Sequence, residues 1–303
     1  MSSAKYNRTV DLLLEVLPFA LQDKRVALKG GTAINLFHRD MPRLSVDIDL
    51  CYLPLEDRET TYKNLHKILL GTKQTIEKNL GLKVGASTSL NGMNEAKIIV
   101  SRDDLSVKIE PNFIVRGSIF QPAQIPLAIN AAKEFRKSME ASCLSLADTY
   151  GGKICAALDR QHPRDLFDIK FLLENEGITK KIKDAFIFYL ISHKRPINEL
   201  LQPNLKNIQR EFNEEFLNMA NVKVELKELL AVRDQLINEV RAALTEEDKN
   251  FLISFVTNDP AWRLFSKHKI EDYPSVKWKL LNLSKMSNQK RQEYNSKLKM
   301  ILE

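Results

Sequence analysis

Hydrophobic residues change their spacing repeatedly along the first part of the chain. From Val10 to Leu21 they recur every three or four positions, which is the period of an amphipathic helix. At Val46–Tyr52 polar and apolar residues alternate instead, as in a strand with one buried face. The elements predicted here are, in order, helix 5–21, strand Val26–Lys29, helix Thr32–Arg39, strand Val46–Tyr52, and helix Glu56–Leu80 closed by Gly81.

Strand patterns continue as far as Leu144, and two predicted helices follow before residue 177. Arg102-Asp103-Asp104 suits a hairpin turn between two strands, and Ser145 and Asp148 have the spacing of a capping box. Pro163 fits the first turn of a helix. The elements predicted here are strands Leu82–Ser89, Glu95–Ser101, Leu105–Phe113 and Met139–Leu144, and helices from Ser145 to about Arg160 and over Arg164–Leu173.

After Gly177 the strand patterns largely disappear and helical periods continue to the end of the chain. We therefore predict an α+β fold: an α/β core with a small mixed sheet, followed by an all-helical domain. The predicted domains are residues 1–177 and the basic helical residues 178–303. No flexible linker separates them.

Composition describes a folded chain with an uneven charge. The 303 residues carry a net charge of +7, and Ala261–Glu303 contributes +6 of it through ten Lys/Arg and four Asp/Glu. Such a tail would face an acidic partner such as RNA, or simply form a solvated helical surface. No apolar run is long enough for a membrane span and no signal peptide is evident. Three cysteines without paired spacing indicate reduced thiols, so we expect a cytoplasmic protein without membrane partners.

Asp47 and Asp49 are the first candidates for chemistry. Residues i and i+2 of a strand point to the same face, so these carboxylates would repel each other unless a cation lies between them. Mg²⁺, a hard ion that prefers oxygen ligands, would suit the pair. The alternative is an edge strand with a polar face, because Asp-x-Asp is a common sequence.

The segment Lys29-Gly30-Gly31-Thr32 lies just before these aspartates. Two glycines between a strand and a helix let backbone N–H groups approach a phosphate, and Thr32 adds a hydroxyl. A tight turn without a ligand would need the same glycines. Together with the paired aspartates, however, the segment predicts a site for a metal-bound nucleoside triphosphate.

Two further groups extend this prediction. Glu110 shares a strand face with Lys108 and would complete a two-metal site, although an exposed charged pair is an equal alternative. Lys153 and Arg160 lie on one side of a helix, where they would hold phosphates. Asp165 and Asp168 follow Pro163, and the helix dipole alone would account for both acids.

Four motifs in order resemble the AbiEii/AbiGii family of nucleotidyltransferase toxins, which includes the MenT toxins and belongs to the DNA polymerase β-like superfamily. The tail segments Asp259–Trp262 and Trp278–Leu283 are similar to the helical C-terminal region of that family. The motifs are Lys29-Gly-Gly-Thr-Ala33, Arg43-Leu-Ser45-Val-Asp47-Ile-Asp49-Leu50, Lys153 with Arg160, and Arg164-Asp165-Leu-Phe-Asp168.

The resemblance implies roles for residues at matching positions. Asp47 and Asp49 would bind two Mg²⁺ ions, with Glu110 as the weakest of the transferred ligands. Lys153 would contact the triphosphate and Asp165 would be the acid of the last motif. The nucleotide-binding residues implied by the motifs and their neighbours are Lys29, Gly30, Gly31, Thr32, Ser45, Lys153 and Arg160. The departures are Gly30-Gly31, where the wider superfamily has Gly-Ser, and a longer stretch from Gly31 to Asp47.

The resemblance also implies an activity and partners. Family members are toxins usually encoded beside an antitoxin; they transfer a nucleotide from an NTP with Mg²⁺, and some MenT members modify the 3′ end of tRNA. We therefore expect transfer of an NMP to an acceptor, with RNA such as tRNA favoured by the basic tail. Alternatives are a non-catalytic nucleotide-, RNA- or protein-binding member of the fold, and transfer to a small molecule. The sequence leaves open the NTP, the acceptor, toxicity in the host, the antitoxin and the oligomeric state.

Overall fold

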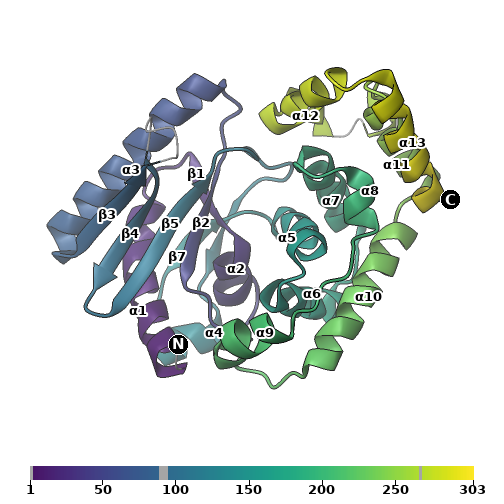
Figure 1. Cartoon of the computed structure of the whole chain (residues 1–303). Helices are drawn as coiled ribbons and strands as arrows, with labels where there is room; N and C mark the ends of the chain where they lie inside the picture. Colours follow the sequence, from purple (N-terminus) through teal and green to yellow (C-terminus); the bar gives the residue numbers. More distant parts are fainter. Residues whose placement is uncertain (1–2, 89–94, 266–267) are drawn as a thin grey trace. The chain divides into compact units, whose positions relative to one another are not determined.

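The computed structural model describes residues 3–88, 95–265 and 268–303. The chain forms two compact units (Figure 1). The first comprises Met1–Thr149 together with Glu214–Lys223, and the second comprises Tyr150–Asn213 together with Val224–Glu303. Across the described part of the chain, no helix combines the length and the apolar character that a membrane crossing requires.

The first unit is built on a mixed sheet that has seven strands among the described residues. Their order across the sheet is β3-β4-β5-β2-β1-β7-β6. The pairs β2–β5 and β1–β7 are parallel and the other neighbours are antiparallel. The strands are β1 (Val26–Lys29), β2 (Asp47–Tyr52), β3 (Lys83–Thr88), β4 (Glu95–Arg102), β5 (Leu105–Asn112), β6 (Ala123–Pro126) and β7 (Glu140–Cys143).

Helices α1 (Ser3–Ala20) and α3 (Arg58–Leu80) cover one face of this sheet (Figure 1). Their apolar residues form one core with the alternate residues of the strands, such as Ile48 and Leu50 of β2 and Ile109 of β5. Burial of Ile48 and Leu50 turns Asp47 and Asp49 to the opposite face, where both remain partly exposed. The predicted alternation of β2 is therefore confirmed.

Two elements of the first unit escaped the sequence patterns. Strand β6 is short and mostly exposed, so it carries no apolar alternation. Helix α4 (Ile129–Phe135) buries only Ala131 fully, which leaves its helical period weak. The predicted helix at Thr32 begins earlier, as α2 (Gly30–Ala33), and continues as a π-helical turn at Ile34–His38.

The second unit is helical, as predicted for the region after residue 177. Its helices are most of α5 (Leu146–Arg160), α6 (Pro163–Asn175), α7 (Lys180–Ser192), α8 (Ile197–Leu201), α9 (Gln209–Glu211), α10 (Leu226–Ala242), α11 (Glu246–Val256), α12 (Pro274–Ser284) and α13 (Asn288–Leu302), with turns of 3₁₀ helix at Trp262–Leu264 and Ile270–Asp272. A π-helical turn at Phe212–Phe216 runs across the unit boundary, and the 3₁₀ turn at Leu217–Met219 belongs to the first unit.

The division into compact units does not coincide with the predicted boundary near residue 177. It falls within α5, because the later part of this helix packs on helices that follow it. Gly151 of α5 approaches α7 so closely that a β-carbon there would lie 2.7 Å from the β-carbon of Ala185. Helix α6 likewise packs on α10. The sequence boundary marked the end of strand patterns, whereas the packing unit begins earlier.

Candidate active site

The pairing of β2 with its neighbours assembles a row of charged side chains on the face of the sheet opposite α1 and α3. Asp49 is paired with Glu110 of β5 and with Lys29 of β1, and Asp47 is paired with Lys108 of β5. Directly paired residues of adjacent strands project to the same face. The structure therefore brings Asp47, Asp49 and Glu110 together across adjacent strands.

The ammonium group of Lys108 lies among these carboxylates. Its Nζ is 2.9 Å from Oε2 of Glu110 and 3.9 Å from Oδ1 of Asp47. Burial lowers the pKa of Lys108, but the hydrogen bond to Glu110 and the charge of Asp47 outweigh burial, so that its pKa lies above the usual value. Lys108 is therefore a full cation at neutral pH. The sequence pattern indicates only that Lys108 shares a strand face with Glu110, because the pairing of β5 with β2 is not visible in it.

The side chains are not arranged as a complete metal-ligand set in this conformation. Among the described residues, no group of three or more His, Cys, Asp or Glu side chains converges in a way that would hold a metal ion. Here the acceptor oxygens of Glu110 and Asp47 face the Lys108 ammonium. The metal roles of Asp47, Asp49 and Glu110 thus remain predictions.

Side chains from the neighbouring loop and strand approach Gly30 and Gly31 so closely that a β-carbon at either position would clash. Gly30 has a φ of +72°, and a β-carbon on it would lie 2.6 Å from Oδ2 of Asp49. A β-carbon on Gly31 would lie 2.8 Å from Nη2 of Arg43 and 2.9 Å from Oγ of Ser45. Only glycine avoids these clashes. The glycine turn and the aspartate strand are therefore in direct contact.

A hydrogen bond from Thr32 connects the glycine turn to β2. Its side chain is fully buried, and its hydroxyl donates to the backbone carbonyl of Asp47 at 2.5 Å. The same hydroxyl is hydrogen-bonded to the hydroxyl of Ser45 at 3.0 Å. In this conformation Thr32 and Ser45 hold the start of β2, and their hydroxyls face each other within the fold. Sequence reasoning had assigned both to nucleotide contact.

Arg43 is a further residue of this corner to which the sequence gave no role. It is buried, and its Nη1 donates to the carbonyl of Leu44 at 2.9 Å while Nη2 faces Gly31. The Arg43 guanidinium therefore occupies the space that a side chain at position 31 would need. Its position two residues before Ser45, within the motif, was the only signal available in the sequence.

The predicted cationic residues of α5 form an ion cluster in the second unit. Nζ of Lys153 is 2.8 Å from Oδ1 of Asp165 and 3.0 Å from Oδ2 of Asp168, and Arg160 pairs with Asp165 at 2.8 Å. Lys153 is only 8% exposed. Burial raises the pKa of Asp165, but the charges of Lys153 and Arg160 outweigh burial and lower it to about 2. The acids of α6 therefore balance Lys153 in addition to lying near a helix N-terminus.

The start of α6 explains how the two acids reach Lys153. Pro163 occupies the first helical position, as predicted, and the ring Nδ1 of His162 accepts a hydrogen bond from the backbone N–H of Arg164 at 3.1 Å. This capped start orients Asp165 and Asp168, one turn apart, towards Lys153. The geometry of the predicted fourth motif is thus that of a buried ion cluster.

Comparison with known protein families identifies the chain. A family model described as "Nucleotidyl transferase AbiEii toxin, Type IV TA system" matches residues 11–282. The chain belongs to the AbiEii nucleotidyltransferase toxin family. The resemblance read from the motifs is confirmed, and family membership favours the enzyme over a non-catalytic member of the fold. The family also implies a nucleotide substrate and a cognate antitoxin.

A solved structure supports the fold of this AbiEii protein. It is similar to MenT4, a nucleotidyltransferase toxin from Mycobacterium tuberculosis H37Rv, with a TM-score of 0.62 and 14% sequence identity. The similarity covers 100% of this chain and 96% of that chain. At this identity the likeness establishes the mixed α/β fold. A search of curated proteins gives no match.

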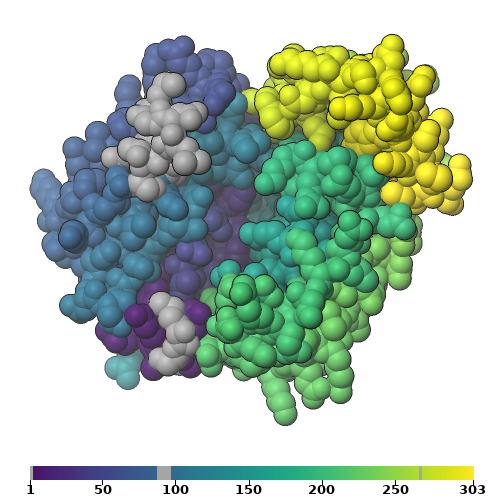
Figure 2. Space-filling model, in the orientation of Figure 1, coloured from purple at the N-terminus to yellow at the C-terminus, as the bar shows by residue number. Residues whose placement is uncertain are grey.

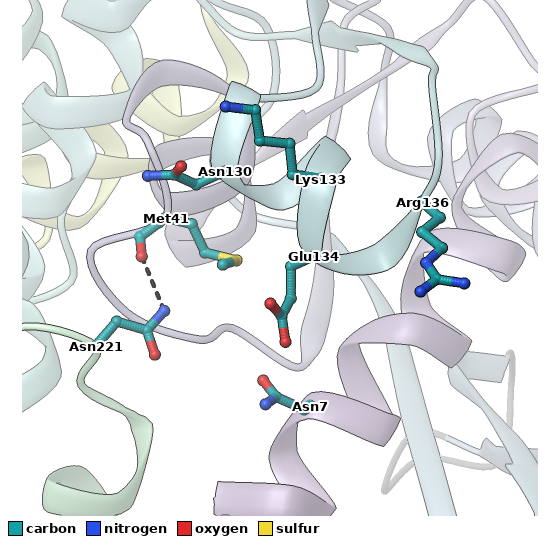
Figure 3. Close-up of a pocket in the computed structure, with 7 residues that line it drawn as sticks. All are labelled: Asn7, Met41, Asn130, Lys133, Glu134, Arg136 and Asn221. Carbon is teal, nitrogen blue, oxygen red and sulfur yellow. Dashed lines mark hydrogen bonds between the residues drawn. The ribbon is translucent and has the colours of Figure 1, made fainter.

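A pocket of the AbiEii protein lies away from the charged row. It has a volume of about 570 Å³ and lies beside α4 in the first unit (Figure 3). Lys133, Glu134 and Arg136 contribute to its lining, and Asn221 closes one side through a hydrogen bond to the carbonyl of Met41 at 2.9 Å. None of the predicted site residues lines it. We therefore do not assign the nucleotide to this pocket.

The aromatic residues of the basic tail differ in their exposure. Trp262 packs on Phe251 and Phe255, and Tyr294 is buried with its hydroxyl accepting a hydrogen bond from Ile197 N–H at 2.6 Å. Trp278 is 46% exposed on α12. Helices α12 and α13 form the yellow surface in Figure 2. Core packing thus accounts for two of these three aromatic residues, and Trp278 is available for a partner.

Proposed function

We propose that this AbiEii enzyme transfers a nucleoside monophosphate from an NTP to an RNA acceptor, with divalent metal ions held at Asp47 and Asp49. The observation that carries the proposal is the contact between the glycine turn and the acidic strand. Asp49 lies against Gly30 and is paired with Glu110, so the glycine turn and two carboxylates occupy one corner of the first unit. That combination suits a metal-bound triphosphate.

The residues present fit a divalent cation in their chemistry. Asp47, Asp49 and Glu110 offer oxygen ligands, which Mg²⁺ prefers, and two of these carboxylates already accommodate the cationic Lys108. Asp47 and Asp49 would hold the metal, with Glu110 as a further ligand. When bound, Mg²⁺ would neutralise phosphate charge and lower the pKa of the attacking hydroxyl.

The protein's own groups would position the reactants. The acceptor oxygen forms a bond to the α-phosphorus as the bond to the β-phosphate oxygen breaks, pyrophosphate leaves, and the hydroxyl proton passes to Glu110. Thr32 fixes the backbone of Asp47, and Gly30 leaves room for Asp49. Because no covalent intermediate is needed, positioning and charge supply most of the rate enhancement.

Lys153 and Arg160 are proposed to contact the triphosphate, as the motif implies. Their situations differ: Lys153 is balanced by two buried carboxylates, whereas the Arg160 side chain is 62% exposed. We therefore assign the direct contact to Arg160 and a supporting contact to Lys153. Lys29 of β1, which is paired with Asp49 of β2, is also proposed to contact the phosphates.

An RNA acceptor is supported by the surface of α12. Lys277, Trp278 and Leu281 occupy one exposed face, and the exposed Lys285 follows at the end of the helix. An aromatic ring flanked by cations suits a base stacked between phosphate contacts. We propose that RNA binds here, and that the three buried free thiols reflect a reducing, cytoplasmic setting.

Label transfer tests the proposal. The full-length protein is incubated with Mg²⁺, total RNA and each α-labelled NTP in turn, and the RNA and protein pools are separated. We expect label in RNA with one preferred NTP, and no label with Asp47→Asn or Asp49→Asn. Asp23→Asn, whose acid pairs with Arg25 in the part of the chain that the structure describes, serves as the control. Label in protein would overturn the RNA acceptor, and transfer by both aspartate variants would overturn the metal site.

A further inference from the structure

Lys108 is a cation that the fold itself supplies to Asp47 and Glu110 in the acidic row. It belongs to β5, and the parallel pairing with β2 places it beside Asp47 while Glu110 lies two residues further along the same face. The ion pairs at 2.9 Å to Glu110 and 3.9 Å to Asp47 link one carboxylate from each strand. Its side chain is 35% exposed, so it can leave this position for solvent without any rearrangement of the core.

Two electrostatic effects act on Lys108 between Asp47 and Glu110. Without Lys108, the carboxylates of Asp47 and Glu110 would lose the cation between them, and their mutual repulsion would weaken the pairing of β2 with β5. A divalent ion bound at Asp47 would in turn lie within a few ångströms of the ammonium, where like charges repel strongly. The two cations therefore compete for the same oxygens.

We propose that Lys108 is a positioning residue that holds Asp47 and Glu110 in the absence of metal and exchanges its place with the incoming divalent ion. The inference rests on the proposed metal role of Asp47 and Asp49. In this account Lys108 keeps the acidic strands paired before the metal arrives and limits metal affinity until the nucleotide contributes its own phosphate ligands.

Direct metal binding without nucleotide tests the exchange. Mn²⁺ binding to the full-length protein is measured by calorimetry at low salt, with thermal unfolding recorded with and without Mn²⁺. Lys108→Met is expected to bind Mn²⁺ about fivefold more tightly, as removal of a competing, partly exposed cation implies. Its unfolding temperature without Mn²⁺ should fall below that of the wild type, and Mn²⁺ should raise it by a larger interval.

Two matched variants separate exchange from a general change in charge. Lys83→Met removes an exposed lysine from the same face of the sheet, two strands away, and should leave Mn²⁺ binding unchanged. Lys108→Arg keeps the cation and should bind Mn²⁺ as the wild type does. If Lys108→Met is recovered unfolded, Lys108→Gln is measured in its place, with the same expectation.

The outcomes distinguish this inference from the proposed function. If Asp49→Asn loses Mn²⁺ binding while Lys108→Met binds like the wild type or more weakly, the exchange is overturned and the metal site stands. An equal gain of affinity in Lys83→Met would also overturn the exchange. If Asp47→Asn and Asp49→Asn both bind Mn²⁺ like the wild type, the metal site itself is wrong and the exchange falls with it.

Discussion

Asp49 lies so close to Gly30 that a β-carbon at the glycine position would displace the Asp49 carboxylate. The closest approach, 2.6 Å from a built β-carbon to Oδ2, coincides with a backbone φ of +72°. Both features are independent reasons for glycine, one from the neighbouring strand and one from the turn. The contact joins the glycine turn at the start of α2 to the acidic strand β2.

Gly30→Ala should destabilise the protein by about 2–3 kcal/mol and remove transferase activity, because strain in the turn adds to displacement of the Asp49 carboxylate. Gly81→Ala is the matched control, since Gly81 has a similar φ of +63° with nothing within 4 Å. It should cost only about 1 kcal/mol and leave activity intact. Denaturant unfolding measures both, and equal costs would contradict a close contact at Gly30.

Thr32→Val should weaken Mn²⁺ binding, because the backbone of Asp47 loses the hydrogen bond that fixes it. The expected cost in stability is about 1–3 kcal/mol, as for other buried acceptors left without a donor. Thr9→Val is the control: Thr9 is equally buried, and its hydroxyl donates to the carbonyl of Lys5 within α1. It should lower stability without changing the Kd for Mn²⁺. An unchanged Kd in Thr32→Val would show that Thr32 does not position Asp47.

Lys153→Met should lower the free energy of unfolding by about 3–5 kcal/mol, because Asp165 and Asp168 would remain buried without their main cation. Arg160→Gln, at the exposed edge of the same cluster, should cost less than 1 kcal/mol in stability. Urea unfolding at neutral pH compares the two variants. A Lys153→Met protein as stable as Arg160→Gln would contradict the ion cluster.

The same cluster predicts a dependence on pH. The pKa of Asp165 is lowered from 3.8 to about 2, so its ionised form is favoured by folding. This contribution, about 2 kcal/mol, is fully present above pH 4 and is lost as the pH falls through 4 towards 2. The cost of Lys153→Met should therefore shrink over that interval. Unfolding measured at pH 7, 4 and 3 checks this, and a cost that grows on acidification would contradict the assignment.

Trp278→Ala should weaken RNA binding by about 1–3 kcal/mol, the range for loss of a stacked base, with no change in protein stability. Trp262→Ala should instead destabilise the fold, because Trp262 packs on Phe251 and Phe255. Filter binding with total tRNA and thermal unfolding separate the two effects. If Trp278→Ala binds RNA like the wild type, the RNA-binding surface of the protein is not at Trp278.

The sequence was sufficient to predict the short elements that carry the site residues. The alternation at β2 and the double glycine after β1 are short-range patterns, so the elements that carry Asp47, Asp49 and Gly30 could be predicted within a few residues. The predicted hairpin turn at Asp103 and the helix end at Gly81 follow for the same reason, since both residues take a left-handed backbone conformation that local sequence favours.

The contacts between residues that are far apart in the sequence could not be predicted from hydrophobic patterns. Lys108 meets Asp47 only because β5 pairs in parallel with β2, across more than fifty residues of sequence that contain α3 and two further strands. Asp165 meets Lys153 through the packing of two helices, which periodicity does not specify. The weakly amphipathic β6 and α4 were missed because neither buries enough apolar surface to leave a pattern.

The central claim is that Asp47 and Asp49 hold the divalent ions of the reaction. Its most direct test is anomalous scattering from crystals of the full-length protein soaked with Mn²⁺ and a non-hydrolysable NTP analogue. We expect Mn²⁺ about 2.0–2.2 Å from carboxylate oxygens of both aspartates, with the triphosphate beside Gly30. Mn²⁺ bound elsewhere, with Asp47 and Asp49 making no contact to it, would contradict the account.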